Sequence, residues 1–171
     1  SPYGFTKVVV DGHFFTPLVE NSLILHLHSF IGYINPMQGR SVPYNELFHI
    51  GGVTTVRGFL FGQIGPQLIN GSSIGGTKAF VLNAELRFPL TTDASIRGVF
   101  FYDGGAGWDT SVIVPDRLLR DNLFEYRHSV GFGIRLTSPA PISVDVGFKL
   151  DRKRRRNEPV AEVHIGYAQS I

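Results

Sequence analysis

Apolar side chains recur at every second position over much of this sequence, and this alternation limits its fold more than any other feature. The clearest segment is 142–151, where Ile, Val, Val, Phe and Leu alternate with Ser, Asp, Gly, Lys and Asp. Successive side chains of a β-strand point to opposite faces, so the pattern predicts a strand with one apolar face. Similar patterns predict seven strands in all, at about 5–15, 22–34, 80–88, 95–103, 129–137, 142–151 and 161–171.

The predicted connections between these strands alternate in length. The short turns fall at 16–21, 89–94 and 138–141, and the long connections at 35–78, 104–127 and 152–160. In an antiparallel sheet this order puts every short turn at one end and every long loop at the other, as in outer-membrane barrels. Predicted strands of roughly 9–13 residues also approach the length that crosses a bilayer at a tilt.

The alternation by itself allows two architectures. In a soluble sandwich or a lipocalin-like barrel the apolar face is the core, whereas in a transmembrane barrel it meets lipid. The polar faces here hold Gly, Ser, Asp and Arg, and charged residues make up only 18% of the chain. Aromatic residues of the apolar face gather near the predicted strand ends, as in the girdles of membrane barrels: Phe14, Phe88, Tyr167, Tyr33 and Tyr102. We therefore expect an all-β, antiparallel transmembrane β-barrel.

Several kinds of site are not expected. The chain has no Cys, which excludes disulfides and thiolate metal ligands, and its net charge of +2 gives no reason to expect a nucleic-acid partner. The stretch GSSIG at 71–75 fits a nucleophile pattern but lacks the strand and helix that this pattern requires. Four histidines fall on the polar faces without metal-ligand spacing, so we expect them to hydrogen-bond to the wall: His13, His26, His28 and His164. We expect no catalytic residue, no metal, no cofactor and no enzymatic activity.

The stretch GGVTTVRGF at 51–59 places one cation in a glycine-rich loop. It resembles the sixth-loop motif of BamA-type outer-membrane assembly proteins, a superfamily that includes TamA, the two-partner secretion transporters and the organelle Sam and Toc barrels. Four further stretches resemble the same family in the same order: NELFHIGG (45–52), NAELRFPL (83–90), FFYDGGAGWD (100–109) and GFGIRLTSPAPISVDVGFKL (131–150). An odd number of antiparallel strands cannot close without one parallel pair. The chain 1–171 is therefore expected to be the C-terminal portion of a larger, 16-stranded barrel.

The resemblance implies that residues 35–78 fold back into the barrel lumen, where the Arg of the motif meets acids of the inner wall. The motif residues are Gly51, Gly52, Val56, Arg57, Gly58 and Phe59. The alternation places Glu85 and Asp103 on the inner faces of the next two strands, and one guanidinium can bridge two carboxylates. Arg87 and Arg97 also face the lumen and could compete for these acids. The alternative for Arg57 is an exposed loop cation without a partner.

The last predicted strand is the part of the chain on which the implied function depends. Its small inner residues suit a thinly packed lateral seam, formed by Gly166, Tyr167, Ala168, Ser170 and Ile171, although the family commonly ends in an aromatic residue. The implied function is the folding and insertion of β-barrel proteins. The alternatives are a two-partner secretion pore and a barrel anchor for an upstream enzyme.

The resemblance also implies where the protein acts and what it meets. The expected location is the bacterial outer membrane, with an organelle outer membrane as the alternative. The expected partners are outer-membrane lipids, unfolded barrel clients and accessory assembly lipoproteins. The basic stretch RKRRRNEP (152–159) is expected in an external loop, either solvated or on lipopolysaccharide phosphates.

Overall fold

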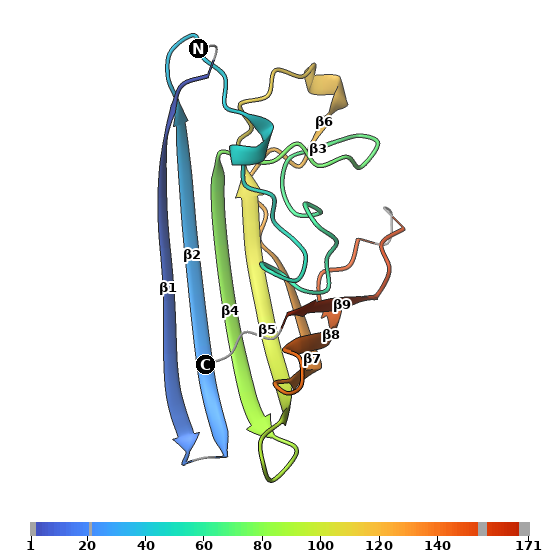
Figure 1. The fold of residues 1–171 in the computed structure, drawn as a ribbon. Coiled ribbons are helices and arrows are strands. Elements are labelled where there is room, and N and C mark those ends of the chain that lie inside the picture. The colour runs from blue at the N-terminus through green and yellow to red at the C-terminus, as the bar shows by residue number, and fades with distance from the viewer. Residues whose placement is uncertain (1–2, 21, 154–156, 168–171) are drawn as a thin grey trace.

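The computed structural model describes residues 3–20, 22–153 and 157–167, and a single antiparallel sheet dominates these ranges. The sheet has seven strands in the order β1-β2-β4-β5-β7-β8-β9. Their bounds are β1 Phe5–Val19, β2 Leu23–Pro36, β4 Lys78–Pro89, β5 Ile96–Trp108, β7 Arg127–Leu136, β8 Ile142–Lys149 and β9 Ala161–Tyr167. The sheet curls into an open trough that does not close on itself (Figure 1). The structure thus confirms the predicted all-β antiparallel fold, as part of a barrel.

The two faces of the sheet differ as the alternation predicted. On β4, Val81 and Glu85 are buried on the concave face, whereas Leu82 between them is exposed on the convex face. Apolar side chains stay exposed along the convex face of other strands, for example Phe100 on β5 and Ile165 on β9. An outward apolar band of this kind is the surface that a membrane barrel presents to lipid.

The described strand lengths span a wider range than the roughly 9–13 residues that were predicted. β1 has 15 residues and β2 has 14, whereas β8 has 8 and β9 has 7. The turn predicted to begin at residue 16 is part of β1, because a register shift between Pro17 and Val19 accommodates the proline. At its end β5 continues to Trp108 through glycines that suggested a loop.

The connections carry short elements that the sequence did not predict. The connection 37–77 contains the 3₁₀ turn η1 (Tyr44–Glu46) and β3 (Gln67–Leu68), and 109–126 contains η2 (Asp116–Leu118) and β6 (Leu119–Arg120). β3 pairs with β6, so the two long connections are joined at the top of the view in Figure 1. In the described ranges, no helix has the length and apolar character needed to cross a membrane.

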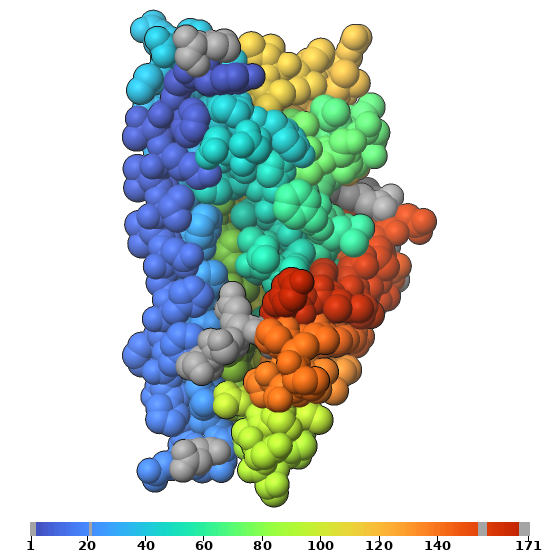
Figure 2. Space-filling model, viewed as in Figure 1, coloured from blue at the N-terminus to red at the C-terminus, as the bar shows by residue number. Residues whose placement is uncertain are grey.

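The long connection 37–77, hereafter the inner loop, covers part of the concave face of the sheet. In Figure 2 it occupies the upper part of the hollow between β1 and β9. An apolar cluster joins the loop to the wall beneath it: Ile34, Val42, Leu47, Phe48, Ile50, Val56, Phe59, Ile64, Ala79 and Val81. Each fully buried side chain of this size contributes about 1.5–3 kcal/mol. The space between the inner loop and the sheet therefore contains an apolar core, in addition to the polar side chains of the concave face.

Candidate functional site

The motif at 51–59 forms a tight turn of the inner loop. The N–H of Gly51 donates to the Thr55 hydroxyl (2.8 Å), and the N–H of Gly52 donates to the Val56 carbonyl (3.1 Å). Gly51, Gly52 and Gly58 have φ values of +115°, +101° and +88°, a backbone conformation that other L-residues rarely adopt. The glycines therefore fold the turn back on itself and present Arg57 to the wall.

Arg57 lies between two inner-wall carboxylates. Its Nε and Nη2 donate to the two oxygens of Asp103 (2.7 and 2.9 Å), and its Nη1 lies 2.6 Å from Glu85 Oε1. The backbone N–H of Arg57 also donates to Asp103 (3.0 Å), and the guanidinium carbon lies 3.7 Å from the centre of the Phe101 ring. Arg57 is 5% exposed and Asp103 is 0% exposed. The contacts predicted for Arg57 are both present, and the alternative of an exposed, unpaired loop cation does not apply.

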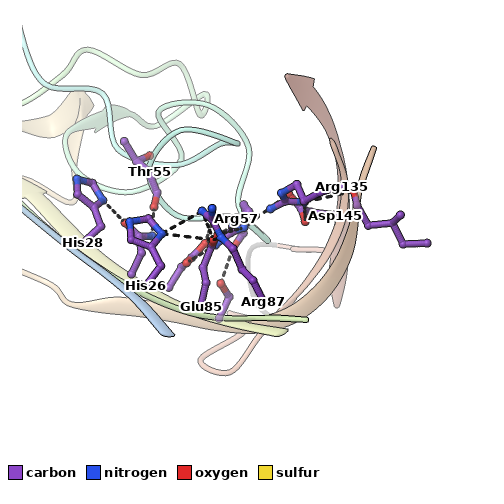
Figure 3. A network of polar contacts seen from close by, with 12 residues as sticks. His26, His28, Thr55, Arg57, Glu85, Arg87, Arg135 and Asp145 are labelled. Carbon is purple, nitrogen blue, oxygen red and sulfur yellow. Dashed lines mark hydrogen bonds and ion pairs between the residues drawn. The ribbon is translucent and has the colours of Figure 1, made fainter. Parts of the chain in front are cut away.

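The pair belongs to a larger charge cluster (Figure 3). Asp145 on β8 lies 3.6 Å from Arg57 and 2.6 Å from Arg135 of β7. Arg87 lies 2.7 Å from Glu85. Three guanidiniums (Arg57, Arg87, Arg135) thus face three carboxylates (Glu85, Asp103, Asp145), and this balance is what makes their burial tolerable.

Electrostatics keep Arg57 charged. Burial lowers the pKa of the Arg57 guanidinium, but the carboxylates of Asp103, Glu85 and Asp145 raise it by more, so that it stands above its ordinary value. Removing the partners of a permanently charged, buried group destabilises the fold, because the charge is left without compensation. Breaking such a buried pair typically costs about 3–5 kcal/mol.

The backbone of the motif binds three further strands. The Ser129 hydroxyl on β7 donates to the Arg57 carbonyl, and the Gly58 N–H donates to Nε2 of His164 on β9 (2.9 Å). Gly58 and Gly147 on β8 touch backbone to backbone, so that a Cβ on Gly147 would overlap Gly58. The motif therefore links β5, β7, β8 and β9 from inside.

Phe59 completes the anchor. Its ring is fully buried and contacts two cations, with the Arg127 guanidinium carbon 4.8 Å and the Lys149 Nζ 5.3 Å from the ring centre. Arg127 in turn binds both oxygens of Glu158 (2.9 and 2.8 Å), which lies in the connection between β8 and β9. The motif is thereby coupled to that external connection as well as to the wall.

The charge cluster itself offers little to a metal ion, because guanidiniums occupy its carboxylates. Among the residues that the structure describes, one group of three His, Cys, Asp or Glu side chains has the spacing of metal ligands. It consists of Asp11, His13 and His28 on β1 and β2.

The sequence of the chain fits one family along almost its whole length. Residues 2–170 match the family described as the Omp85 superfamily domain. The chain belongs to the Omp85 superfamily.

Individual relatives of this Omp85 chain agree with that assignment. It is 30% identical to the outer membrane protein assembly factor BamA of Nitratidesulfovibrio vulgaris over 152 residues, which cover 88% of the chain and 18% of that protein. It is 30% identical over 124 residues to a SAM50-like protein of Schizosaccharomyces pombe, covering 71% of the chain and 26% of that protein. The chain thus spans about a quarter or less of these relatives.

A solved structure shows the same fold. The crystal structure of Haemophilus ducreyi BamA lacking POTRA domains 1–3 superposes with a TM-score of 0.73, covering 95% of this Omp85 chain and 34% of that chain. Sequence identity in this comparison is 21%, so it speaks for the fold alone.

Sequence reasoning missed several partners of the motif in this Omp85 chain. Asp145, Ser129 and His164 lie on inner faces that the alternation identified, but the sequence does not say how deep a loop reaches or which wall residues it meets. Arg87 does contact Glu85 as expected. In the described part of the chain, Arg97 contacts none of the three carboxylates. Arg135, which was not predicted, contacts Glu85 and Asp145 instead.

The predicted seam residues fall partly within the structure. Gly166 faces the inner loop, where an added Cβ would lie 3.1 Å from Val53. Tyr167 points outward and is 89% exposed. Ala168, Ser170 and Ile171 lie outside the described residues, so their place in a seam stays a prediction.

Proposed function

We propose that this chain is the C-terminal barrel part of a factor that folds and inserts β-barrel proteins into the outer membrane. One observation carries the proposal: the motif binds β5, β7, β8 and β9 from inside, so that β9 is held in place by the inner loop. A rigidly held strand with an available edge is a template for another strand.

The proposed mechanism is strand addition. A client strand pairs with the edge of β9, and the client grows in the membrane while the wall behind β9 stays fixed by the inner loop. No covalent bond changes in this mechanism, and the proposal therefore includes no enzymatic step and no cofactor.

The names of the relatives support the proposal. BamA of Nitratidesulfovibrio vulgaris and BamA of Neisseria meningitidis are both outer membrane protein assembly factors, the latter 38% identical over 77 residues, which cover 41% of the chain and 10% of that protein. We accordingly propose a bacterial outer-membrane location. We also propose unfolded barrel proteins, accessory lipoproteins and membrane lipids as partners. In a proposed lipopolysaccharide contact of this connection, Lys153 would have to leave its ion pair with Glu125.

The test is a client-folding assay with the full-length protein in liposomes. We expect the wild type to speed the folding of an unfolded barrel client, measured by its heat-modifiable mobility. Arg57→Ala should lose most of this acceleration while its own barrel stays inserted. Arg97→Ala is the matched control, because Arg97 also faces the lumen without touching the three carboxylates, and it should behave as the wild type.

Two outcomes would contradict the proposal. One is equal client folding by the wild type and by empty liposomes. The other is export of a partner protein through the reconstituted wild type without any effect on client insertion, which would favour a secretion pore.

A further inference from the structure

Strand pairing brings three metal-ligating side chains together on the concave face of β1 and β2. His13 on β1 stands opposite His28 on β2, and their rings stack with centres 4.2 Å apart at 11°. Asp11 reaches both, with its Oδ1 2.7 Å from His28 Nε2 and 3.5 Å from His13 Nε2. One ligand atom from each of the three residues lies within 4.8 Å of the other two. We propose that Asp11, His13 and His28 form a binding site for a divalent transition-metal ion such as Zn²⁺.

The other nitrogens of the two imidazoles are held by groups behind the site. His28 Nδ1 lies 2.7 Å from Asn83 Oδ1, and the orientation of this amide is fixed because Asn83 Nδ2 donates to the Thr55 carbonyl (2.7 Å). His13 Nδ1 lies 2.9 Å from His26 Nε2. Metal-binding histidines usually donate their second ring N–H to such a partner, which orients the ring and its coordinating nitrogen. Both Nε2 atoms are thereby aimed at the same carboxylate.

The spacing suits a small ion. Zn²⁺ sits about 2.0–2.2 Å from nitrogen and oxygen ligands, which puts neighbouring ligand atoms of a tetrahedral site about 3.3 Å apart. The measured separations from Asp11 Oδ1, 2.7 and 3.5 Å, lie on either side of that value. Two imidazoles and one carboxylate favour Zn²⁺, Cu²⁺ or Ni²⁺ over Mg²⁺ and Ca²⁺, which prefer oxygen ligands.

An ion can reach the site from the lumen. The side chains of Asp11 and His13 are 49% and 41% exposed, while His28 is 14% exposed. Water can therefore complete the coordination. In the sequence these residues gave no metal signal, because they meet only through the register of β1 and β2.

The site also borders the inner loop. The chain of contacts runs from His28 to Asn83 and from Asn83 to Thr55, which lies two residues before Arg57. An ion bound at Nε2 holds His28 in the orientation that fixes Asn83. The metal would thus restrict the motion of Asn83, whose side chain donates to the Thr55 carbonyl of the inner loop.

The test measures metal binding by the full-length protein in detergent after chelator treatment. Zn²⁺ is titrated by calorimetry, and Co²⁺ by the visible absorption that reports its coordination. We expect the wild type to bind one equivalent more than Asp11→Asn, His13→Gln or His28→Gln. His128→Gln is the matched control, because His128 lies on β7 against Tyr102 outside the group, and it should keep that equivalent.

A fourth variant tests the supporting residue. Asn83→Ala should still bind the ion but about 10–100-fold more weakly, as expected for the loss of a partner that orients a ligand. Asp11→Asn changes only one exposed side-chain atom, so it gives a folded variant, verified by heat-modifiable mobility. Equal stoichiometry and affinity in the wild type and in folded Asp11→Asn and His28→Gln would overturn the site.

Discussion

The concave faces of β1 and β5 follow the same alternation but lie in opposite environments. On β5 the inner residues Val99, Phe101 and Asp103 are buried beneath the inner loop, whereas on β1 the inner residues Val9 and Phe15 are exposed. The difference arises because the loop docks toward β5, β7 and β8. The alternation therefore determines which face of the sheet a side chain occupies. The inner loop determines whether a side chain on the concave face is buried.

The consequence is a difference in how charges are treated. The acids beneath the loop are each paired with guanidiniums at short distance, as Asp103 is with Arg57. On β1, Asp11 meets only imidazoles and keeps half of its side chain in contact with the open lumen. We expect substitutions under the loop to be costly and those on β1 to be mild.

The largest effect is expected from Arg57→Ala. It leaves Asp103 and Glu85 buried without their cation, so the free energy of unfolding should fall by about 3–5 kcal/mol. Urea unfolding of the full-length protein in lipid measures this loss, and protease cleavage within the inner loop reports its release. Arg97→Ala should change neither readout, and an equal loss in both variants would show that the pairing is unimportant.

The same site allows a test of geometry. Arg57→Lys should restore little, since an ammonium cannot present the planar fork that binds two carboxylates. Glu85→Gln and Asp103→Asn should each be non-additive with Arg57→Ala in double-mutant cycles. Full additivity would mean that Arg57 does not act through these acids.

A charge on the convex face should have the next largest effect. Val146→Arg on β8 places a cation against lipid and should cost about 2–4 kcal/mol at mid-bilayer. Val9→Arg is the matched substitution on the concave face of β1 and should cost much less. Retention of the folded, heat-modifiable form in lipid measures both. A reversed order would indicate that the concave face of β1, and not the convex face of β8, meets the membrane.

The addition of one methyl group should be more destabilising beneath the inner loop than on β1. Gly147→Ala drives a Cβ into the Gly58 backbone, and overpacking of this kind typically costs about 1–3 kcal/mol. Gly12→Ala, on the convex face of β1, meets only the Ser29 hydroxyl at 3.6 Å and should be near neutral. The unfolding midpoint in urea distinguishes them, and equal midpoints would argue against close contact of the motif with β8.

The smallest effect concerns pH. Burial raises the pKa of Glu158, but its bonds to Arg127 and to the Lys153 N–H lower it by more, to about 2 from 4.5. Because the folded-state pKa lies below that of the unfolded chain, the stabilisation is fully present above pH 4.5 and is lost as the pH falls toward 2. The difference in the free energy of unfolding between the wild type and Glu158→Gln should therefore become smaller as the pH falls from 4.5 toward 2. A difference that stays constant from pH 5 to pH 2 would contradict the assignment.

The sequence predicted the faces of the strands well, because a period of two is a local property of the chain. It also identified Glu85 and Asp103 as inner-wall acids on the two strands after the loop. It did not predict the extension of β5, since glycines at 104, 105 and 107 suggest a turn. In the structure, Gly105 and Gly107 leave room for Ile50 and Val56 of the loop. Asp145, His164 and the pairing of β3 with β6 depend on how the loop docks, which no local pattern records.

The hydrogen bond from Gly58 to His164 joins residues that are 106 positions apart. Closing so long a segment is entropically unfavourable and tends to be slow, so this contact is expected late in folding. The inner loop cannot reach its full set of partners until β9 has been synthesised and placed beside β8. Docking of the motif and placement of β9 should then occur as one cooperative step, which makes the arrival of β9 a checkpoint for the maturation of this part of the barrel.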